Sequence, residues 1–337
     1  MKTRILGKSN LKVSSIGMGC WAIGGPFYHK GGHIIAYGHV NDKDSLSAIE
    51  KGLELGVTIF DTANVYGLGR SETILGKALK GKREDVVIAT KFGTTFDFNS
   101  GDPDVPGRIV GRDHSPEGIR KACDESLKRL QTNYIDFYQI HSGNMSAEEA
   151  SIVVNTLEEL VEEGKIRYYG WSTDDPERAR LISQGKHCTG MQFRINFTQT
   201  NQKMFELIDE LNFGGLIKGP LAGGIFTGKY NAESKLPKEH GLSRVDFSDE
   251  RYVILNNKLD QIKELMTNDG RTLPQGALGY VLAQHERIIP IPGFKTAKQV
   301  EENVRTIELG PLSKKLVQQI DDLFSEFRKD HSEIQRG

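Results

Sequence analysis

A short apolar run followed by a helix-like segment recurs along the chain, and this alternation constrains the fold more than any other feature. The clearest runs lie at residues 57–61, 86–91 and 134–141, where β-branched or aromatic residues give continuously apolar centres. Such runs are typical of strands buried on both faces. Five weaker candidates complete a set of eight and lie at residues 15–20, 167–171, 190–194, 214–218 and 287–291.

The segments between these runs begin with residues that are typical of helix N-caps. A proline directly follows Ser115 and Asp175, at the first helical position, where a missing N–H leaves no hydrogen bond unmade. Ser146 and Glu149 form a capping box ahead of an apolar face. The predicted helix starts are Asp44, Ser115, Ser146 and Asp175.

Alternation at about 35–40 residues per unit predicts parallel strands that are joined by crossover helices. Eight such units fit a closed (β/α)8 TIM barrel, and we expect residues 1–337 to form a single barrel domain. An amphipathic pattern over residues 312–327 predicts an additional C-terminal helix in the outer layer.

The charges of the chain nearly cancel, with 44 lysines and arginines against 45 aspartates and glutamates. This balance argues against a protein that binds nucleic acid through a broad basic face. No apolar run approaches the ~18 residues of a membrane span, and residues 1–8 lack the apolar core of a secretory signal. Three scattered cysteines predict reduced, buried thiols. We therefore expect a cytoplasmic protein that acts on a small molecule.

Polar residues close three successive predicted strands: Asp61, Lys91 and His141. The carboxyl ends of barrel strands form the mouth where active sites are built, so we expect these side chains to meet. Tyr66 lies in the loop that follows Asp61. A lysine ammonium lowers the pKa of a nearby tyrosine, ordinarily ~10, and an aspartate would hold the lysine in place. A histidine across the site could donate a hydrogen bond to a carbonyl oxygen.

Four motifs in this region carry a resemblance to a known family. Residues 60–67 read FDTANVYG, residues 71–76 read SETILG, residues 90–91 read TK, and residues 136–141 read DFYQIH. In this order they resemble the aldo-keto reductase superfamily, and the similarity extends over nearly the whole chain, from Gly17 to Asn303.

The resemblance implies a barrel that binds NADP(H) without a Rossmann domain and reduces an aldehyde or a ketone. Tyr66 would give the proton to the carbonyl oxygen, and the same steps would run backwards when an alcohol is oxidised. The implied catalytic tetrad is Asp61, Tyr66, Lys91 and His141, and the implied substrate contacts are Trp21, Tyr66 and His141.

Two glycine-rich segments resemble nucleotide-binding motifs, but each lacks one residue that the motif requires. Residues 67–72 begin like the dinucleotide fingerprint, but Glu72 stands where the third glycine belongs. Residues 223–229 have the spacing of a phosphate loop, but Tyr230 replaces the Ser or Thr that binds magnesium. The sequence therefore disfavours a Rossmann domain and a kinase or ATPase.

The segment around Lys295 is a better candidate for binding phosphate. Lys295 precedes a capping box formed by Thr296 and Gln299, and a helix N-terminus beside a cation attracts anions. The resemblance implies that this segment grips the adenosine 2′-phosphate, which favours NADP over NAD. The implied contacts are Gly293, Phe294, Lys295, Thr296, Gln299 and Asn303, with Glu302 at the adenine.

The resemblance also assigns the rest of the cofactor site. Two positions depart from many relatives: Thr173 stands where Asn is common, and Lys218 stands where an aromatic residue often stacks on the nicotinamide. The implied contacts are Gly19, Cys20, Trp21 and Asp61; Ser172, Thr173, Gln192 and Lys218 near the nicotinamide; and Gly219, Pro220, Leu221, Gly223, Gly228 and Lys229 in the pyrophosphate loop.

Three long segments are expected to be loops that cover substrate and cofactor. They are the segment after the first strand and residues 93–113 and 231–252. The first contains His29, His33 and His39, but no cysteine or carboxylate cluster gives them a metal-binding geometry, so we expect no metal. The polar character of these loops suggests polar substrates such as sugars or hydroxyaldehydes.

Three alternatives remain open at this stage. Lys91 could form a Schiff base in a barrel aldolase or lyase. The chain could be a redox-sensing binding subunit that resembles the β subunits of potassium channels. A dehydrogenase that works mainly in the oxidising direction would share every residue of the predicted site.

Overall fold

The computed structural model describes residues 2–99, 101, 106–141, 143–238 and 240–330. Its main sheet has eight parallel strands in the order β14-β13-β12-β11-β10-β7-β6-β3, so strands that follow one another along the chain lie side by side. Two hydrogen bonds join its edges, from Gly17 N to Pro290 O (2.9 Å) and from Gly19 N to Pro292 O (3.0 Å). The predicted barrel is therefore confirmed. Its strands are β3 (Met18–Gly19), β6 (Ile59–Asp61), β7 (Val87–Phe92), β10 (Ile135–His141), β11 (Ile166–Ser172), β12 (Cys188–Arg194), β13 (Gly214–Lys218) and β14 (Ile288–Pro290).

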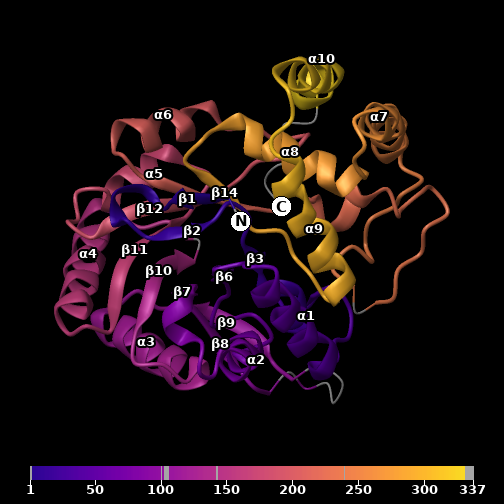
Figure 1. Cartoon of the computed structure of the whole chain (residues 1–337). Helices are drawn as coiled ribbons and strands as arrows, with labels where there is room; N and C mark the ends of the chain where they lie inside the picture. Colours follow the sequence, from indigo (N-terminus) through magenta and orange to yellow (C-terminus); the bar gives the residue numbers. More distant parts are fainter. Residues whose placement is uncertain (1, 100, 102–105, 142, 239, 331–337) are drawn as a thin grey trace.

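Helices surround these strands (Figure 1). Two further helices lie outside the repeating units: α7 (Glu250–Asn268), which the sequence pattern did not predict, and α10 (Lys314–Asp330), the expected C-terminal helix. These two contact each other, and both contact α8. The remaining helices are α1 (Asp42–Glu54), α2 (Arg70–Ala78), α3 (Pro116–Leu130), α4 (Ala147–Glu162), α5 (Pro176–Ile182), α6 (Gln202–Glu210), α8 (Leu273–Gln284) and α9 (Ala297–Leu309).

Most predicted helix starts are confirmed by their capping hydrogen bonds. Ser115 and Asp175 cap α3 and α5, and the capping box of Ser146 is present at the start of α4. The prediction for α1 is wrong by one turn. Asn41 caps this helix by accepting from Lys43 N, and Asp44 lies within the first turn, where its charge favours the helix dipole.

The N-terminal residues form a hairpin that plugs one end of the barrel. Strands β1 (Thr3–Ile5) and β2 (Lys12–Ser14) pair antiparallel around the turn η1 (Gly7–Ser9). Apolar residues of this hairpin pack against side chains that point into the barrel. This inner cluster comprises Leu6, Leu11, Val13, Ile59, Val87, Ala89, Phe137, Leu216, Ile289 and Ile291.

The loop expected at residues 93–113 contains two paired strands, so that prediction is wrong for residues 94–97 and 108–112. Strands β8 (Thr94–Asp97) and β9 (Arg108–Arg112) pair antiparallel, and β9 pairs with β4 (Phe27–Tyr28). The segment after the first barrel strand contains η2 (Cys20–Ile23), β4 and β5 (Ile34–Ile35). Residues 100, 102–105 and 239 of the predicted loops lie outside the described residues.

Across the part of the chain that the structure describes, no helix combines the length and apolarity needed to cross a membrane. The three cysteines, Cys20, Cys123 and Cys188, are buried and free.

Candidate active site

Alternation along the strands brings the polar strand ends together inside the barrel mouth. Side chains of a strand point to opposite faces in turn, so Asp61, Lys91 and His141 share the inward face with Ile59, Ala89 and Phe137 of the inner cluster. The strand register places Asp61 beside Ala89, Lys91 beside Gln139 and His141 beside Ser172. The inside of the barrel is therefore apolar at the plugged end and polar at the mouth.

Lys91 lies at the centre of this polar layer and is fully buried. Its ammonium donates to Asp61 Oδ2 (2.7 Å), to the carbonyl of Thr62 (2.8 Å) and to the hydroxyl of Tyr66 (3.2 Å). Three acceptors satisfy the three N–H groups of the ammonium, so its position is fixed. The structure thus joins three of the four predicted catalytic residues by direct hydrogen bonds.

The second oxygen of Asp61 is held by two amides. Asp61 Oδ1 accepts from Gln192 Nε2 (2.7 Å) and from Gln139 Nε2 (3.2 Å), and Gln192 also donates to Gln139 Oε1 (3.2 Å). Gln139 belongs to the motif at residues 136–141 but was not among the predicted site residues. It stands two residues before His141 and therefore on the same face of β10, a signal that could have identified it.

Burial and neighbouring charges shift the pKa values of Lys91 and Tyr66 in opposite directions. Burial alone would lower the pKa of Lys91, but the charges of Asp61 and Tyr66 outweigh it, and the pKa is raised. Burial raises the pKa of Tyr66, and the neighbouring Lys91 ammonium opposes this without reversing it. We expected lysine to lower the tyrosine pKa overall; the lysine acts in that direction, but desolvation of the phenol prevails. Tyr66 consequently holds its proton.

His141 completes the group from the end of β10. Its ring stands edge-on to Tyr66, with 5.7 Å between the ring centroids. Desolvation, followed by the charges of Lys91, Lys218 and Arg112, lowers its pKa well below 6.5. The imidazole is therefore neutral at neutral pH. Among the residues that the structure describes, nothing forms a hydrogen bond with its buried Nδ1.

A cavity of about 1750 Å³ opens over Tyr66 and His141. Trp21 stacks on Tyr66 at 5.8 Å and stands edge-on to Tyr37 at 5.3 Å, so two aromatic side chains line the cavity beside the phenol. The predicted cofactor residues that line the cavity are Gly19, Trp21, Asp61, Ser172, Gln192, Lys218, Gly219, Pro220, Leu221, Gly223, Lys229, Gly293, Phe294, Lys295, Gln299, Glu302 and Asn303.

Four predicted cofactor residues lie behind this lining. The Cys20 thiol is buried against the carbonyl of Met18, and Thr173 Oγ1 accepts from Asp175 N. Gly228 ends the turn η4 (Ala222–Thr227) in a left-handed conformation, and Thr296 caps α9.

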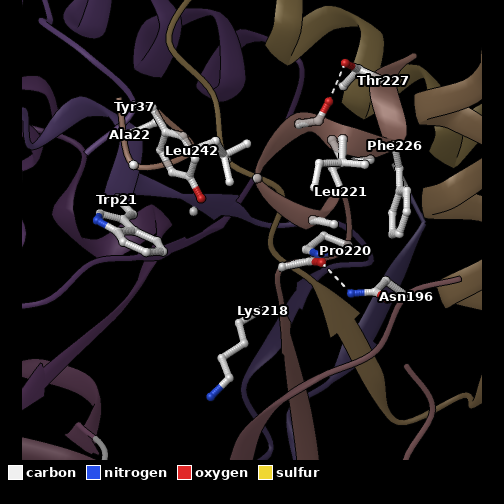
Figure 2. A pocket seen from close by; sticks show the side chains of 18 of the residues that line it. Trp21, Ala22, Tyr37, Asn196, Lys218, Pro220, Leu221, Phe226, Thr227 and Leu242 are labelled. Atoms are coloured by element: carbon white, nitrogen blue, oxygen red, sulfur yellow. Dashed lines mark hydrogen bonds between the residues drawn. The ribbon is translucent and has the colours of Figure 1, made fainter. Parts of the chain in front are cut away.

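Glycines shape the loop that follows β13. Gly223 and Gly224 have φ values of 65° and 95°, so the backbone of η4 turns in a way that most side chains would strain. The amide of Asn196 donates to Gly219 O (3.1 Å), and Thr227 Oγ1 donates to Gly224 O (2.7 Å), as Figure 2 shows. This fixed loop exposes backbone to the cavity.

Lys295 stands where it was predicted but has partners that the sequence did not reveal. Its ammonium donates to the carbonyls of Tyr37 and His39, in the segment after the first barrel strand. Gln299 Oε1 accepts from Lys295 N (2.7 Å) and Thr296 N (3.3 Å), which confirms the capping box. No local pattern could have found the Tyr37 contact, because the two residues are distant in the chain.

Two of the three loop histidines contact each other. The rings of His29 and His33 stack at 4.6 Å. Within the described ranges, the structure brings together no group of three metal-ligating side chains.

Comparison with known proteins agrees with this geometry. Residues 15–324 match the sequence profile of the aldo/keto reductase family. The chain belongs to this family. It is 33% identical to the probable aldo-keto reductase 1 of Glycine max over 318 residues, which are 94% of this chain and 86% of the relative.

Two further members of the family show how similar the chain is to proteins with more specific names. It is 30% identical to the NADH-specific methylglyoxal reductase of Escherichia coli (strain K12), over 92% of this chain and 94% of that one. The holo form of the aldo-keto reductase AKR11C1 from Bacillus halodurans aligns with a TM-score of 0.75 and 30% identity over 96% of both chains. Members of the aldo/keto reductase family are oxidoreductases that act on carbonyl groups, and this is the reaction class of the chain.

The loop that carries Tyr66 depends on a close backbone approach. A Cβ added at Gly67 (φ 59°) would lie 1.9 Å from the carbonyl oxygen of Gly24. Gly81 (φ 77°) provides a matched control, because a Cβ there would meet no atom within 4 Å. We expect Gly81→Ala to lower the free energy of unfolding by about 1–2 kcal/mol through the left-handed backbone alone.

We expect Gly67→Ala to cost about 1–3 kcal/mol more than Gly81→Ala, because the loop must move to accept the methyl group. Urea denaturation of the two variants measures the difference. Equal losses for both variants would mean that the loop opens freely and does not fix Tyr66.

Proposed function

We propose that the chain is an NADP(H)-dependent oxidoreductase that interconverts an aldehyde or a ketone with its alcohol. The observation that carries the proposal is the hydrogen bond from the buried Lys91–Asp61 pair to the hydroxyl of Tyr66, at the floor of a cavity and beside a neutral histidine. An acid with a fixed cationic neighbour suits proton transfer to a carbonyl oxygen as it gains charge.

The roles of the side chains follow from this arrangement. NADPH, when bound, supplies the hydride that reaches the carbonyl carbon. The hydroxyl of Tyr66 gives its proton to the carbonyl oxygen, and the Lys91 ammonium stabilises the phenolate that remains. Asp61 holds Lys91 in position, while neutral His141 donates a hydrogen bond that orients the carbonyl. Oxidation of an alcohol uses the same contacts in reverse, with Tyr66 as the base.

The residues around the cavity fit a cofactor that carries phosphates. Lys229 and Lys295 line the same part of the cavity, and the charge of Lys229 contributes to lowering the pKa of Lys295 after desolvation. Two neighbouring ammonium groups beside the N-terminus of α9 and a glycine-rich turn form a suitable anion site. Lys295 would bind the 2′-phosphate, which favours NADP(H) over NAD(H).

An aldolase that uses Lys91 is a poorer explanation of the same site. A Schiff-base lysine must present a neutral amine to substrate, which requires a lowered pKa. Lys91 instead has a raised pKa, no exposed surface and three hydrogen-bond acceptors. The geometry therefore favours the reductase. We also propose that the protein works in the cytoplasm, which is consistent with its free cysteines.

The phosphate assignment predicts a change in cofactor preference. We expect Lys295→Ala to lower the ratio of Kd for NADH to Kd for NADPH by about 10- to 100-fold, because one charge-assisted hydrogen bond to phosphate contributes roughly 1.5–3 kcal/mol. Lys298→Ala is the matched control, since Lys298 is exposed in the first turn of α9, close to Lys295 in the chain, and lies outside the cavity lining. Titration of each variant with the two cofactors, followed by tryptophan fluorescence, measures the ratio. An unchanged ratio in Lys295→Ala would place the 2′-phosphate elsewhere.

The whole proposal is tested by the same titration on the unmodified protein, followed by assays of NADPH oxidation with a panel of aldehydes. We expect NADPH to bind at least about tenfold more tightly than NADH. Failure to bind either cofactor would remove the redox function.

A further inference from the structure

The cavity lining has a strong excess of positive charge. Of the described residues that line it, nine are lysine or arginine and two, Asp61 and Glu302, are acidic. The chain as a whole has a net charge of −1, so this excess is local. Asp61 does not offset this positive charge, because its carboxylate is paired with Lys91 and also accepts hydrogen bonds from Gln139 and Gln192.

Four of these nine cations form two pairs that matter for ligand binding. Lys229 and Lys295 are the first pair and stand in the part of the cavity proposed for the cofactor phosphates. After desolvation, the charge of Lys229 contributes to lowering the pKa of Lys295, and both charges contribute to lowering the pKa of His240. Arg112 and Lys218 are the second pair: both line the cavity together with His141, one of the proposed catalytic residues, and their charges contribute to lowering the pKa of His141. The second pair therefore lies on the cavity wall on the side of His141.

Lys218 stands at the end of β13 and lines the cavity, and Figure 2 shows its side chain pointing away from Pro220 and Leu221. Its ammonium lies 3.4 Å from Asp174 Oδ2 and donates to Ser172 Oγ at 3.3 Å. An acidic partner and a hydroxyl thus hold this cation against the wall of the cavity.

Arg112 reaches the site from the opposite side, at the end of β9. Its side chain passes over the segment that follows His141: a Cβ at Gly143 would lie 3.5 Å from Arg112 Cδ. The side chain is exposed and lines the cavity together with Thr94 and Gly111 of the same hairpin. A guanidinium carries a planar fork of donors that fits a carboxylate.

We propose that the physiological substrate carries a carboxylate, which Arg112 binds while the carbonyl group lies at Tyr66 and His141. This inference rests on the proposed function and specifies its substrate class: an aldehyde or ketone acid rather than a neutral sugar. Lys218 adds to the positive field around the carboxylate. Arg112 makes the direct contact.

Two aldehydes that differ only in charge test this inference. The assay compares kcat/KM for 4-carboxybenzaldehyde with kcat/KM for its methyl ester, using NADPH. We expect the wild-type protein to prefer the acid by about tenfold or more, and Arg112→Gln to lower this preference about tenfold, chiefly through the KM of the acid. Arg112→Lys keeps the charge without the fork and should retain an intermediate preference.

Arg108→Gln is the matched control. Arg108 is exposed on the same strand but lies outside the cavity lining, so this variant should keep the wild-type preference. Equal kcat/KM values for acid and ester in the wild-type protein would overturn the inference and leave the reductase proposal standing. A preference for the acid that survives Arg112→Gln would also overturn it.

A binding measurement separates this inference from the reductase proposal. Trp21 is 38% exposed in the cavity and reports on occupancy by its fluorescence. We expect 4-(hydroxymethyl)benzoate to bind more tightly than its methyl ester, and Arg112→Gln to remove the difference. If neither aldehyde were reduced but this difference appeared, the reductase proposal would fail and the carboxylate site would stand. Equal binding of acid and ester would eliminate the carboxylate site whatever the turnover.

Discussion

Replacing Tyr66 with phenylalanine should lower kcat for carbonyl reduction by about 10²- to 10⁴-fold, the contribution typical of a positioned general acid. The substitution removes only the hydroxyl, which lies 3.2 Å from the Lys91 ammonium and faces the cavity. The ring that stacks on Trp21 remains. The loss should therefore appear in kcat, while Kd for NADPH stays close to the wild-type value.

Tyr134→Phe controls for the loss of a tyrosine hydroxyl in general. Tyr134 directly precedes β10, at the opposite end of this strand from His141, and its ring stacks with the Arg83 guanidinium. Steady-state rates and cofactor titrations of both variants make the comparison. Turnover by Tyr66→Phe within about threefold of wild type would show that another group gives the proton.

Replacing Lys91 with methionine should lower the free energy of unfolding by about 3–5 kcal/mol, the loss typical when one member of a buried ion pair is removed. The side chains of Lys91 and Asp61 are almost completely buried, and their charged atoms lie 2.7 Å apart. Methionine fills a similar volume, so the main cost is the Asp61 carboxylate left without its counter-ion.

The double variant Lys91→Met with Asp61→Asn isolates that cost. Removing both charges should recover about 1–3 kcal/mol relative to Lys91→Met alone, because no unpaired ion remains buried. Urea denaturation of the wild type, the two single variants and the double variant provides the cycle. Independent, additive losses would mean that the carboxylate is solvated in the folded protein and that Asp61 does not hold Lys91 in place.

Local sequence patterns were sufficient to predict the fold. The apolar strand centres, the proline after Ser115 and the capping box of Ser146 depend on residues a few positions apart, and each is found where expected. The same logic placed Asp61, Lys91 and His141 at one mouth, since parallel strands in a barrel end on the same side. The hairpin at β8–β9 and the helix α7 were not predicted from the sequence. Both lie in polar, glycine-rich segments in which the apolar pattern is weak.

Long-range contacts decided the rest. Asp61 meets Gln192 and Gln139 only because the closed barrel turns the inward faces of three alternate strands, β6, β10 and β12, toward one another, and no spacing in the sequence encodes that contact. The bonds from Lys295 to the carbonyls of Tyr37 and His39 join segments from the two ends of the chain.

The direction of the Tyr66 pKa shows the difference most clearly. From the sequence we could predict a lysine near Tyr66 that lowers its pKa. We could not predict how deeply the phenol is buried, and burial raises the pKa by more than the lysine lowers it. The sequence by itself thus determined which groups stand at the barrel mouth, through the period of its strands. Only the tertiary structure decided their protonation and their partners, because desolvation and Coulomb interactions depend on distances between residues far apart in the chain.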